Sequence, residues 1–292
     1  MPVVFDLHCD TPINIAKRKF NHIKPEKLRK QSYLGAIFAH FISPKTKDPF
    51  TDAVKLIIST IAYLTEKNSI NIIHNYKELK KKKTNIILGV EGGHVFDKSF
   101  KQFEVLYGLD VRVFTITWNN SNKLAHSALD ADKKGLTKKG KEFMKKLAHY
   151  DIIIDLSHAS TRTVLDVCEV SSNPIIASHS CVRALNPRFL RNIADCAIEA
   201  IAKRGGVIGI NFSRYHLGNY RIVDHLEYLK NNFCIDVAAI GSDFDGINDA
   251  VFSGPLGIKK LERELAKKGY KREEISKICY QNFLRVFKTV SQ

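Results

Sequence analysis

The sequence has no long apolar run and lacks the features that mark secreted proteins. No stretch of its 292 residues approaches the apolar length of about 18 residues that spans a membrane. The first residues lack the basic segment and cleavage site of a secretory signal. The six cysteines are scattered and include no Cys-x-x-Cys pair, which is typical of reduced thiols rather than of a disulfide framework. We therefore expect a cytoplasmic protein with no membrane association.

Acidic residues are fewer than basic residues in this sequence. The chain has 46 Lys and Arg against 30 Asp and Glu, a net charge of +16. Such an excess favours polyanions in general. Here the lysines are spread along the chain, without interleaved aromatic residues and without a nucleic-acid-binding motif. We expect a solvated, lysine-rich surface and no nucleic-acid partner.

The chain does contain eight short apolar runs, most of them rich in Ile and Val. They cover residues 3–7, 35–42, 85–90, 111–117, 152–156, 174–177, 206–211 and 237–240. Near-continuous runs of this kind indicate strands buried on both faces. Segments with helical periodicity lie between them, for example 51–67, 137–149, 160–170, 195–204 and 223–231.

The alternation of strand and helix predicts an α/β fold. An open doubly wound sheet is the alternative, but its usual Gly-x-Gly-x-x-Gly turn after the first strand is missing. We predict a single domain over residues 1–292, a (β/α)₈ TIM barrel with C-terminal helices at 258–268 and 273–290. Long connections at 14–31 and 118–136 are expected to shape access to a site.

Residues that bind metals or transfer protons follow five of the eight runs. In a barrel, functional groups sit at the carboxyl ends of the strands. The ends of the first, third, fifth, sixth and eighth runs carry His8 and Asp10, Glu91, His158, His179 and Asp243. Since these runs are far apart in the sequence, their shared pattern predicts one site at the rim of the barrel.

The five residues other than Asp243 form a nitrogen and oxygen ligand set for Zn²⁺ or a similar transition ion. Five exceeds the three protein ligands usual at a single catalytic zinc, so we expect one carboxylate to be shared by two metals. Glu91, between Gly89 and Gly92, can approach such a pair closely. Two metals about 3.5–4 Å apart would hold a bridging hydroxide as nucleophile. Asp243 would then shuttle a proton.

Other histidines and one aspartate receive simpler interpretations. His94 is expected to be a loop residue or a partner of a ligand, and Asp155 a core residue or such a partner. The remaining histidines, His216 among them, are expected to be ordinary loop, core or surface residues.

These motifs resemble the renal (membrane) dipeptidase family of metal-dependent amidohydrolase barrels. The resemblance rests on DLHCDTP at 6–12, EGGH at 91–94, DLSH at 155–158, SHS at 178–180, Arg191-Asn192, GSDFDG at 241–246 and NFLRVF at 282–287. The motifs keep the family's order and cover nearly the whole chain. The resemblance implies a binuclear zinc dipeptidase that hydrolyses the peptide bond of dipeptides, and a homodimer, since family members tend to dimerise.

The resemblance also implies roles for individual residues. His8 and Asp10 would bind one Zn²⁺, His158 and His179 the other, and Glu91 would bridge the two ions. Arg191 would pair with the terminal carboxylate of the substrate. Asp243 would pass the proton of the attacking water to the leaving amine.

The match departs from the family at one substrate-contacting position. Trp118 stands where the animal enzymes carry a histidine. Its indole N–H can still meet an oxyanion, so Trp118 is predicted to contact substrate. Two alternatives remain open: a metal-dependent phosphoesterase or nuclease on the same barrel, and a non-catalytic binding protein. The net charge favours the first, but such barrels usually open with His-x-His, and Asp10 takes the second place here.

Overall fold

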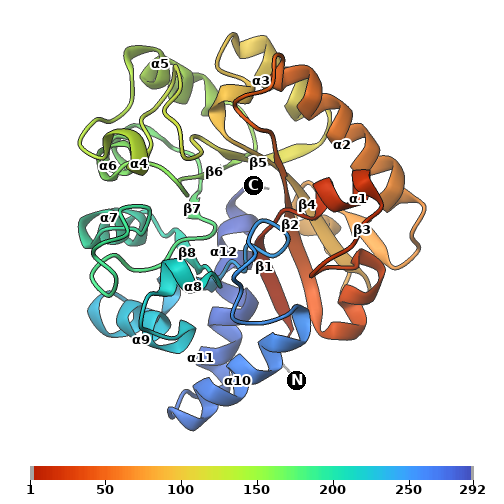
Figure 1. Cartoon of the computed structure of the whole chain (residues 1–292), viewed down its shortest axis with the longest axis vertical. Coiled ribbons are helices and arrows are strands. Elements are labelled where there is room, and N and C mark those ends of the chain that lie inside the picture. Colours follow the sequence, from red (N-terminus) through yellow and green to blue (C-terminus); the bar gives the residue numbers. More distant parts are fainter. Residues whose placement is uncertain (1–2, 291–292) are drawn as a thin grey trace.

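Eight parallel strands follow one another around a barrel in this computed structural model, which describes residues 3–290 (Figure 1). The ring consists of β1 (Val4–Cys9), β2 (Tyr33–Phe41), β4 (Thr84–Glu91), β5 (Val111–Thr115), β6 (Ile153–Asp155), β7 (Ile175–Ala177), β8 (Val207–Ile210) and β9 (Ala238–Ile240). Each of the eight apolar runs forms one of these strands. The predicted α/β barrel is confirmed.

The ring closes between its first and last strands at their carboxyl ends. The backbone N–H of Asp10 donates to the Phe244 carbonyl at 2.9 Å, and that of Asp243 donates to the His8 carbonyl at 3.0 Å. These bonds run between residues that the sequence separates by more than two hundred positions. They set the end of β1 beside the loop after β9, where predicted site residues occur on both segments.

An apolar core fills the barrel. Every ring strand contributes a buried side chain to it, and the helix α12 (Asn282–Thr289) covers its amino-terminal end. The Phe5 ring of β1 lies 4.7 Å from the Phe283 ring of α12. A second, larger layer packs the outer faces of the strands against the helices. The core and α12 close the interior of the barrel from its amino-terminal end, so the interior is reached from the carboxyl ends of the strands.

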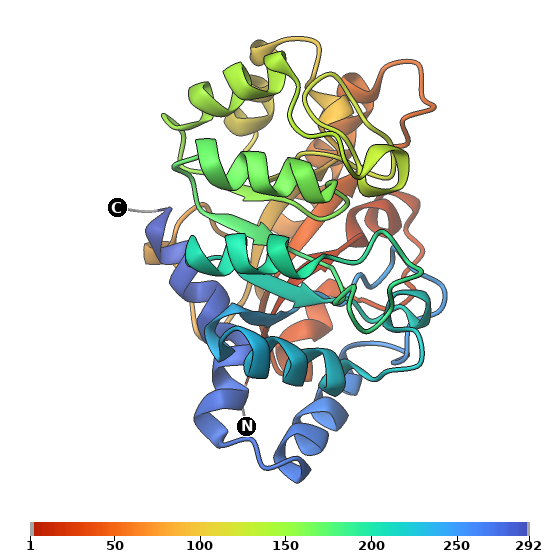
Figure 2. The same ribbon diagram turned by 90° about the vertical axis from the view of Figure 1, so that its left-hand side faces the viewer.

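Helices cover the outside of the ring, and the side view in Figure 2 shows several of them stacked against the strands. They are α1 (Thr11–Lys17), α2 (Pro49–Thr65), α3 (Phe100–Gly108), α4 (Ala128–Ala131), α5 (Lys138–Leu147), α6 (Thr161–Val170), α7 (Asp195–Lys203), α8 (Arg214–Leu217), α9 (Ile222–Asn232) and α10 (Ile258–Lys267). Short 3₁₀ turns are η1 (Pro25–Gln31), η2 (Tyr76–Glu78), η3 (Gly93–Val95), η4 (Ile235–Val237) and η5 (Pro255–Gly257). None of the helices within residues 3–290 has the length and apolar character needed to cross a membrane.

Two features differ from the expectation. The predicted helix at 273–290 is interrupted: α11 (Arg272–Ser276) and α12 are joined by a π-helical turn, Lys277–Gln281. A short strand, β3 (Ile70–Ile72), pairs with β4 outside the ring. It has only three residues, too few to show a periodic pattern. The predicted domain, 1–292, extends past the described residues at both ends.

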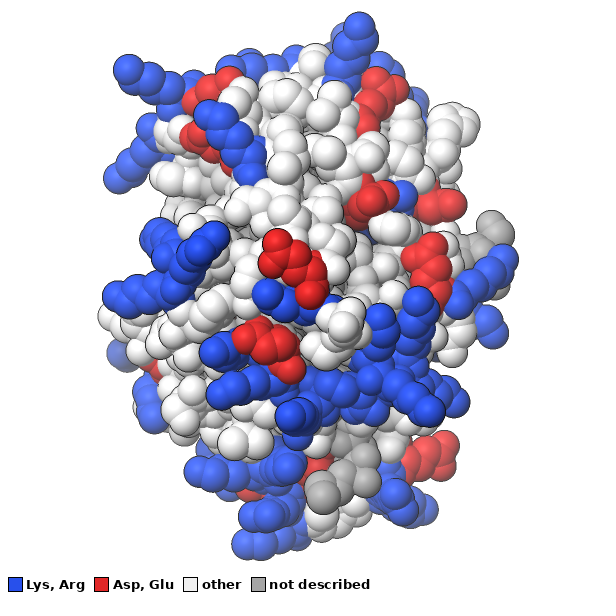
Figure 3. Space-filling view, turned by 90° about the vertical axis from the view of Figure 1, so that its right-hand side faces the viewer, with Lys and Arg blue, Asp and Glu red and all other residues white. Residues whose placement is uncertain are grey.

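Basic side chains are spread over the surface. Figure 3, which views the side lying on the right of Figure 1, shows Lys and Arg across the face, gathered most densely in its lower half, with Asp and Glu between them.

Candidate metal centre

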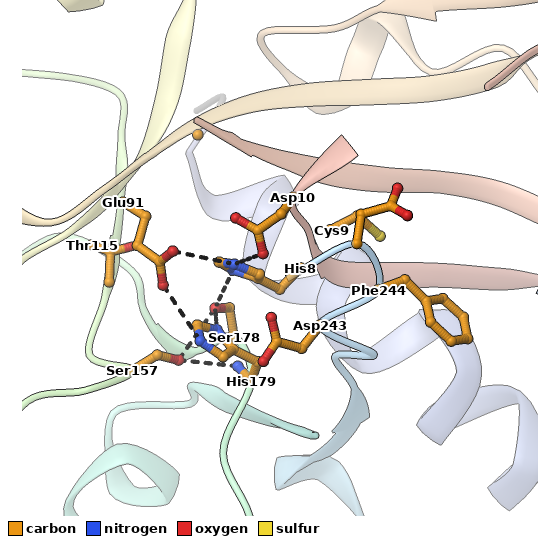
Figure 4. Close-up of polar contacts among 12 residues, drawn as sticks. His8, Cys9, Asp10, Glu91, Thr115, Ser157, Ser178, His179, Asp243 and Phe244 are labelled. Atoms are coloured by element: carbon orange, nitrogen blue, oxygen red, sulfur yellow. Dashed lines mark hydrogen bonds and ion pairs between the residues drawn. The ribbon is translucent and has the colours of Figure 1, made fainter. Parts of the chain in front are cut away.

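The predicted ligands converge at the open end of the barrel. His8 and Asp10 come from the end of β1, Glu91 is the last residue of β4, and His158 and His179 follow β6 and β7. All five are buried. Figure 4 shows His8, Asp10, Glu91, His179 and Asp243 turned toward one another. The structure therefore brings together every residue that the sequence predicts for the metal site.

Glu91 lies between two groups of ligand atoms. Its Oε2 is 3.8 Å from Nε2 of His8, which is in turn 3.5 Å from Oδ2 of Asp10. Its Oε1 is 3.0 Å from Nε2 of His158 and 3.4 Å from Nε2 of His179. Within each of two triads, His8, Asp10 and Asp243 or Glu91, His158 and His179, the ligand atoms lie within 4.8 Å of one another. The site thus offers two adjacent positions for a cation.

Hydrogen bonds at the rear of the imidazole rings orient His8 and His179. The Ser178 hydroxyl donates to Oδ2 of Asp155 at 2.7 Å, so its lone pairs face Nδ1 of His179 at 2.8 Å and Nδ1 of His8 at 3.1 Å. In their neutral form these rings therefore carry the proton on Nδ1, which leaves the lone pair on Nε2 facing the centre, where a metal would bind it. The amide oxygen Oδ1 of Asn119 accepts a hydrogen bond from Nδ1 of His158 at 2.8 Å and so orients this third ring in the same way.

Asp155 lies close to two histidines, but it does not compete as a ligand. Its Oδ1 accepts from the backbone N–H of Ser157 at 3.0 Å and of Ser178 at 2.8 Å. Its Oδ2 accepts from the hydroxyls of Thr115 at 2.8 Å and of Ser178. Since both oxygens are engaged, Asp155 supports the ligands from behind, as one of the two sequence interpretations proposed.

The centre holds more carboxylates than cationic groups, and two of its buried polar atoms lack hydrogen-bond partners among the described residues. Nε2 of His8 and Oε1 of Glu91 are inaccessible and have no hydrogen-bond partner among the described residues. Burial lowers the pKa of His8, but the carboxylates of Glu91, Asp10 and Asp243 outweigh burial and raise this pKa to about 10. Burial raises the pKa of Glu91. A cation between these groups would satisfy both the unpaired atoms and the excess of carboxylates.

Burial also keeps the other two imidazoles neutral. It lowers the pKa of His158 and of His179 well below the ordinary value, with nearby positive groups acting in the same direction. Their Nε2 atoms are 2.9 Å apart. Two neutral rings that present lone pairs to one point suit a transition metal such as Zn²⁺. The residues present therefore fit the metal.

Backbone strain is concentrated at the same place. His158, Asp243 and Asp245 have φ values of 67°, 59° and 71°, in the left-handed region that non-glycine residues seldom adopt. All three line the cavity above the centre. Strain of this kind persists where the surrounding structure holds a residue in a required orientation.

A cavity of about 440 Å³ opens above the centre. Trp118 forms part of its wall, and its ring lies tilted against the Phe41 ring with the two centres 4.8 Å apart. Arg191 lines it as well and is only 4% exposed. Further lining residues are Ile13, Asn14, Lys17, Leu129, Phe189, His216 and Ile247. Both residues predicted to contact substrate thus face the cavity that holds the candidate ligands.

Comparison with known proteins assigns the family. The model of the family described as membrane dipeptidase (peptidase family M19) matches residues 1–292. The chain belongs to this family.

Curated relatives are similar over most of the chain. Mouse Dipeptidase 3 is 28% identical over 325 residues, which covers 98% of this chain and 64% of the mouse protein. A Klebsiella pneumoniae protein described only as an uncharacterized protein in the pqqA 5′ region is 30% identical over 224 residues, 71% of this chain and 82% of that protein. This M19 chain thus spans about two thirds of the length of the mouse relative.

Solved structures share the fold of this M19 chain. The dipeptidase AC, a metallo peptidase of family M19, superposes with a TM-score of 0.89 at 21% identity, covering 98% of both chains. A metallo peptidase from Rhodobacter sphaeroides, liganded with a phosphinate mimic of the dipeptide L-Ala-D-Ala, gives 0.87 at 20% identity, covering 99% of both chains.

Sequence reasoning missed several residues of the M19 site. Asn119 hydrogen-bonds to His158, and Asn211 hydrogen-bonds to Asp243. Gly246, which has no side chain, leaves room for the carboxylates of Asp10 and Asp243. Ser178 lies within one of the family motifs, but its sequence context gives it no role. His216, which was expected to be an ordinary loop, core or surface residue, lines the cavity. The sequence does not predict this position, because α8 has only four residues and is too short to show a periodic apolar face.

Proposed function

We propose that this chain is a metallo-dipeptidase that uses two zinc ions bridged by Glu91. The observation that carries the proposal is the Glu91 carboxylate between two groups of ligand atoms, those of His8 and Asp10 and those of His158 and His179, with unpaired buried atoms at the centre. His8 and Asp10 would hold one ion, and His158 and His179 the other. Family membership and the metallo peptidase with a bound dipeptide mimic support dipeptides as substrates.

Zinc bound here would lower the pKa of water to supply a nucleophile and would polarise the scissile carbonyl. The protein's own residues do the rest. Arg191 binds the C-terminal carboxylate of the substrate, and the indole N–H of Trp118 faces the carbonyl oxygen. The cavity of about 440 Å³ has the size of a small-molecule site.

Asp243 carries the proton from water to the leaving amine. Burial and the neighbouring Asp10 raise the pKa of Asp243 to about 7, against the opposing influence of His8. A carboxyl group with a pKa near the working pH can both accept and donate a proton. Asp243 also completes the triad with His8 and Asp10, so it is placed beside the reacting centre.

The test is the metal content of the purified protein, followed by hydrolysis of a small dipeptide panel with and without chelator. We expect about two zinc ions per chain and cleavage that chelator abolishes and zinc restores. Two metals with turnover of a phosphodiester instead of dipeptides would favour the phosphoesterase alternative, which the net charge of +16 suggests. No metal after attempted reloading would overturn the proposal.

A further inference from the structure

A second cavity, of about 620 Å³, lies at the amino-terminal end of the barrel, away from the metal centre. Val3 precedes β1, Leu34 is near the start of β2, and Leu79 lies in the loop before β4, so the cavity opens where these strands begin. Leu284 of α12, the helix in blue at the left of Figure 2, forms another part of its wall. All four side chains belong to the barrel core or pack against it, so the floor of the cavity is apolar.

Four cationic side chains line this cavity, and no carboxylate among residues 3–290 does. The four are Arg29, Lys81, Arg285 and Lys288. None of them forms an ion pair with a carboxylate in the part of the chain that the structure describes. The cavity above the metal centre is the opposite, since four carboxylates and two cationic side chains line it. A negatively charged ligand is therefore favoured at the amino-terminal end.

The two guanidinium groups are held in place, whereas the two ammonium groups are not. Nη2 of Arg29 donates to the Lys81 carbonyl at 2.8 Å, which ties η1 to the loop before β4. Arg285 donates from Nη1 and Nη2 to two backbone carbonyls at 2.6 and 2.8 Å. Lys81 and Lys288 are exposed, and neither Nζ has a hydrogen-bond partner within residues 3–290. Like charges around one cavity repel one another, and a bound polyanion would remove this repulsion.

Two tyrosine rings and an amide complete the wall. Tyr76 comes from η2, and Tyr280 and Gln281 come from the π-helical turn that interrupts the last helix. Such single turns occur frequently at functional sites. The Gln281 amide makes a 3.4 Å hydrogen bond to the Tyr280 hydroxyl, which leaves its carbonyl oxygen and a second N–H for a ligand. Aromatic faces stack on nucleobases, and side-chain amides pair with their edges.

We propose that this cavity binds a nucleoside triphosphate, with the base against Tyr280 and the phosphates at the cationic side chains. A triphosphate carries several negative charges, whereas a monocarboxylate would leave most of the four cations uncompensated. A cavity of this volume has the size of a small-molecule or cofactor site. The inference goes beyond the proposed dipeptidase function and does not depend on it, because the two cavities share no lining residue.

Calorimetry of the zinc-loaded protein with ATP, in an excess of Mg²⁺ that keeps ATP from extracting zinc, tests the proposal. Lys81→Glu and Lys288→Glu should each raise the Kd of ATP about tenfold, in line with the loss of a hydrogen bond to a charged group. Lys145→Glu, at an exposed position on α5, changes the net charge equally and should bind ATP as wild type does. Thermal unfolding followed by circular dichroism should be the same for all three variants.

Two further probes separate stacking from charge. Inorganic tripolyphosphate lacks a base, and adenosine lacks the phosphates, so both should bind more weakly than ATP. Tyr280→Leu keeps an apolar side chain against the barrel core. It should weaken binding of ATP about tenfold, the contribution of one stacked base, and change binding of tripolyphosphate less than about twofold.

The site is located by a variant at the other end of the barrel. His179→Ala, which removes a predicted metal ligand, should still bind ATP. Loss of binding in His179→Ala but not in Lys81→Glu or Lys288→Glu would place ATP at the metal centre and overturn the inference. No measurable binding to wild type, or equal effects of Lys145→Glu and Lys288→Glu, would also overturn it. An anionic lysophospholipid that displaces ATP and binds more tightly would assign the cavity to an amphiphile instead.

Discussion

Asn211 donates a hydrogen bond from Nδ2 to Oδ2 of Asp243 at 2.8 Å, with both side chains buried. The hydrogen bond from Asn211 therefore holds the carboxyl group by its Oδ2 atom. The other oxygen, Oδ1, lies toward Gly246 and Asp10. Because Asp243 also has a left-handed backbone, its orientation is determined by the fold and not by the substrate.

The Asp243→Asn variant should lower kcat by about 10³-fold, the contribution of a well-placed acid–base group. The amide keeps the shape of the side chain but cannot carry the proton. Steady-state kinetics on a dipeptide, with metal content measured on the same sample, tests this. Near-normal turnover at full metal content would contradict the role of Asp243, whereas loss of metal would show that it acts as a ligand.

The Ser178→Ala variant should weaken metal binding about 10- to 100-fold, the usual effect of losing the group behind a histidine ligand. One hydroxyl orients both His8 and His179, so both metal positions should be affected. Titration with zinc against a competing chelator measures the affinities. Ser276→Ala, on the exposed side of α11, is the control and should bind zinc normally. Equal zinc affinity in the two variants would refute the orienting role.

The Gly246→Ala variant should lose the metal held by His8 and Asp10. A Cβ atom at Gly246 would lie 2.1 Å from Oδ2 of Asp10 and 2.6 Å from Oδ1 of Asp243, so these carboxylates would have to move. Zinc content should fall from about two ions per chain to about one. Gly108→Ala, where a Cβ meets no atom within 4 Å, should keep full content. Two tightly bound ions in Gly246→Ala would contradict this account.

His40 should make the protein less stable in acid. It is fully buried on β2, where Nδ1 donates to the Gly89 carbonyl at 2.7 Å, and burial lowers its pKa to about 4. The unfolded chain takes up this proton near pH 6.5, but the folded protein does so only near pH 4. The stability from neutral His40 is therefore complete above pH 6.5 and is lost as the pH falls toward 4, about 3 kcal/mol in all.

Urea unfolding of metal-free protein between pH 7 and pH 4 measures this loss. The free energy of unfolding of wild type should fall by about 3 kcal/mol more than that of His40→Gln. His149→Gln, at an exposed position, should retain the pH dependence of wild type. An equally steep decline in His40→Gln would show that other groups cause the acid sensitivity.

The barrel was predictable because its strands are buried on both faces. Continuous Ile and Val runs such as 152–156 and 206–211 are typical of strands in a parallel sheet, and their number and spacing indicate the closed ring. The π-helical turn at Lys277–Gln281 was not predictable, since apolar spacing continues through it from α11 into α12. The three-residue strand β3 is too short to show a period.

The convergence of the candidate ligands was predictable because they lie at or directly after the ends of these strands. His8 and Glu91 are identified by position alone once the fold is known. The residues that hydrogen-bond to these side chains were not predictable, since their roles depend on contacts between segments that are distant in the sequence. Asn119 reaches His158 across 39 positions, and Asn211 reaches Asp243 across 32. His216 reaches the cavity only because amide side chains tie α8 to the loop after β7.

The central claim is that Glu91 lies between two metal ions. An anomalous difference map at the zinc absorption edge, from crystals of the zinc-loaded protein, tests it most directly. We predict two peaks about 3.5–4 Å apart on either side of the Glu91 carboxylate, one beside His8 and Asp10 and the other beside His158 and His179. A single peak, or peaks that leave Glu91 without contact, would contradict the binuclear centre.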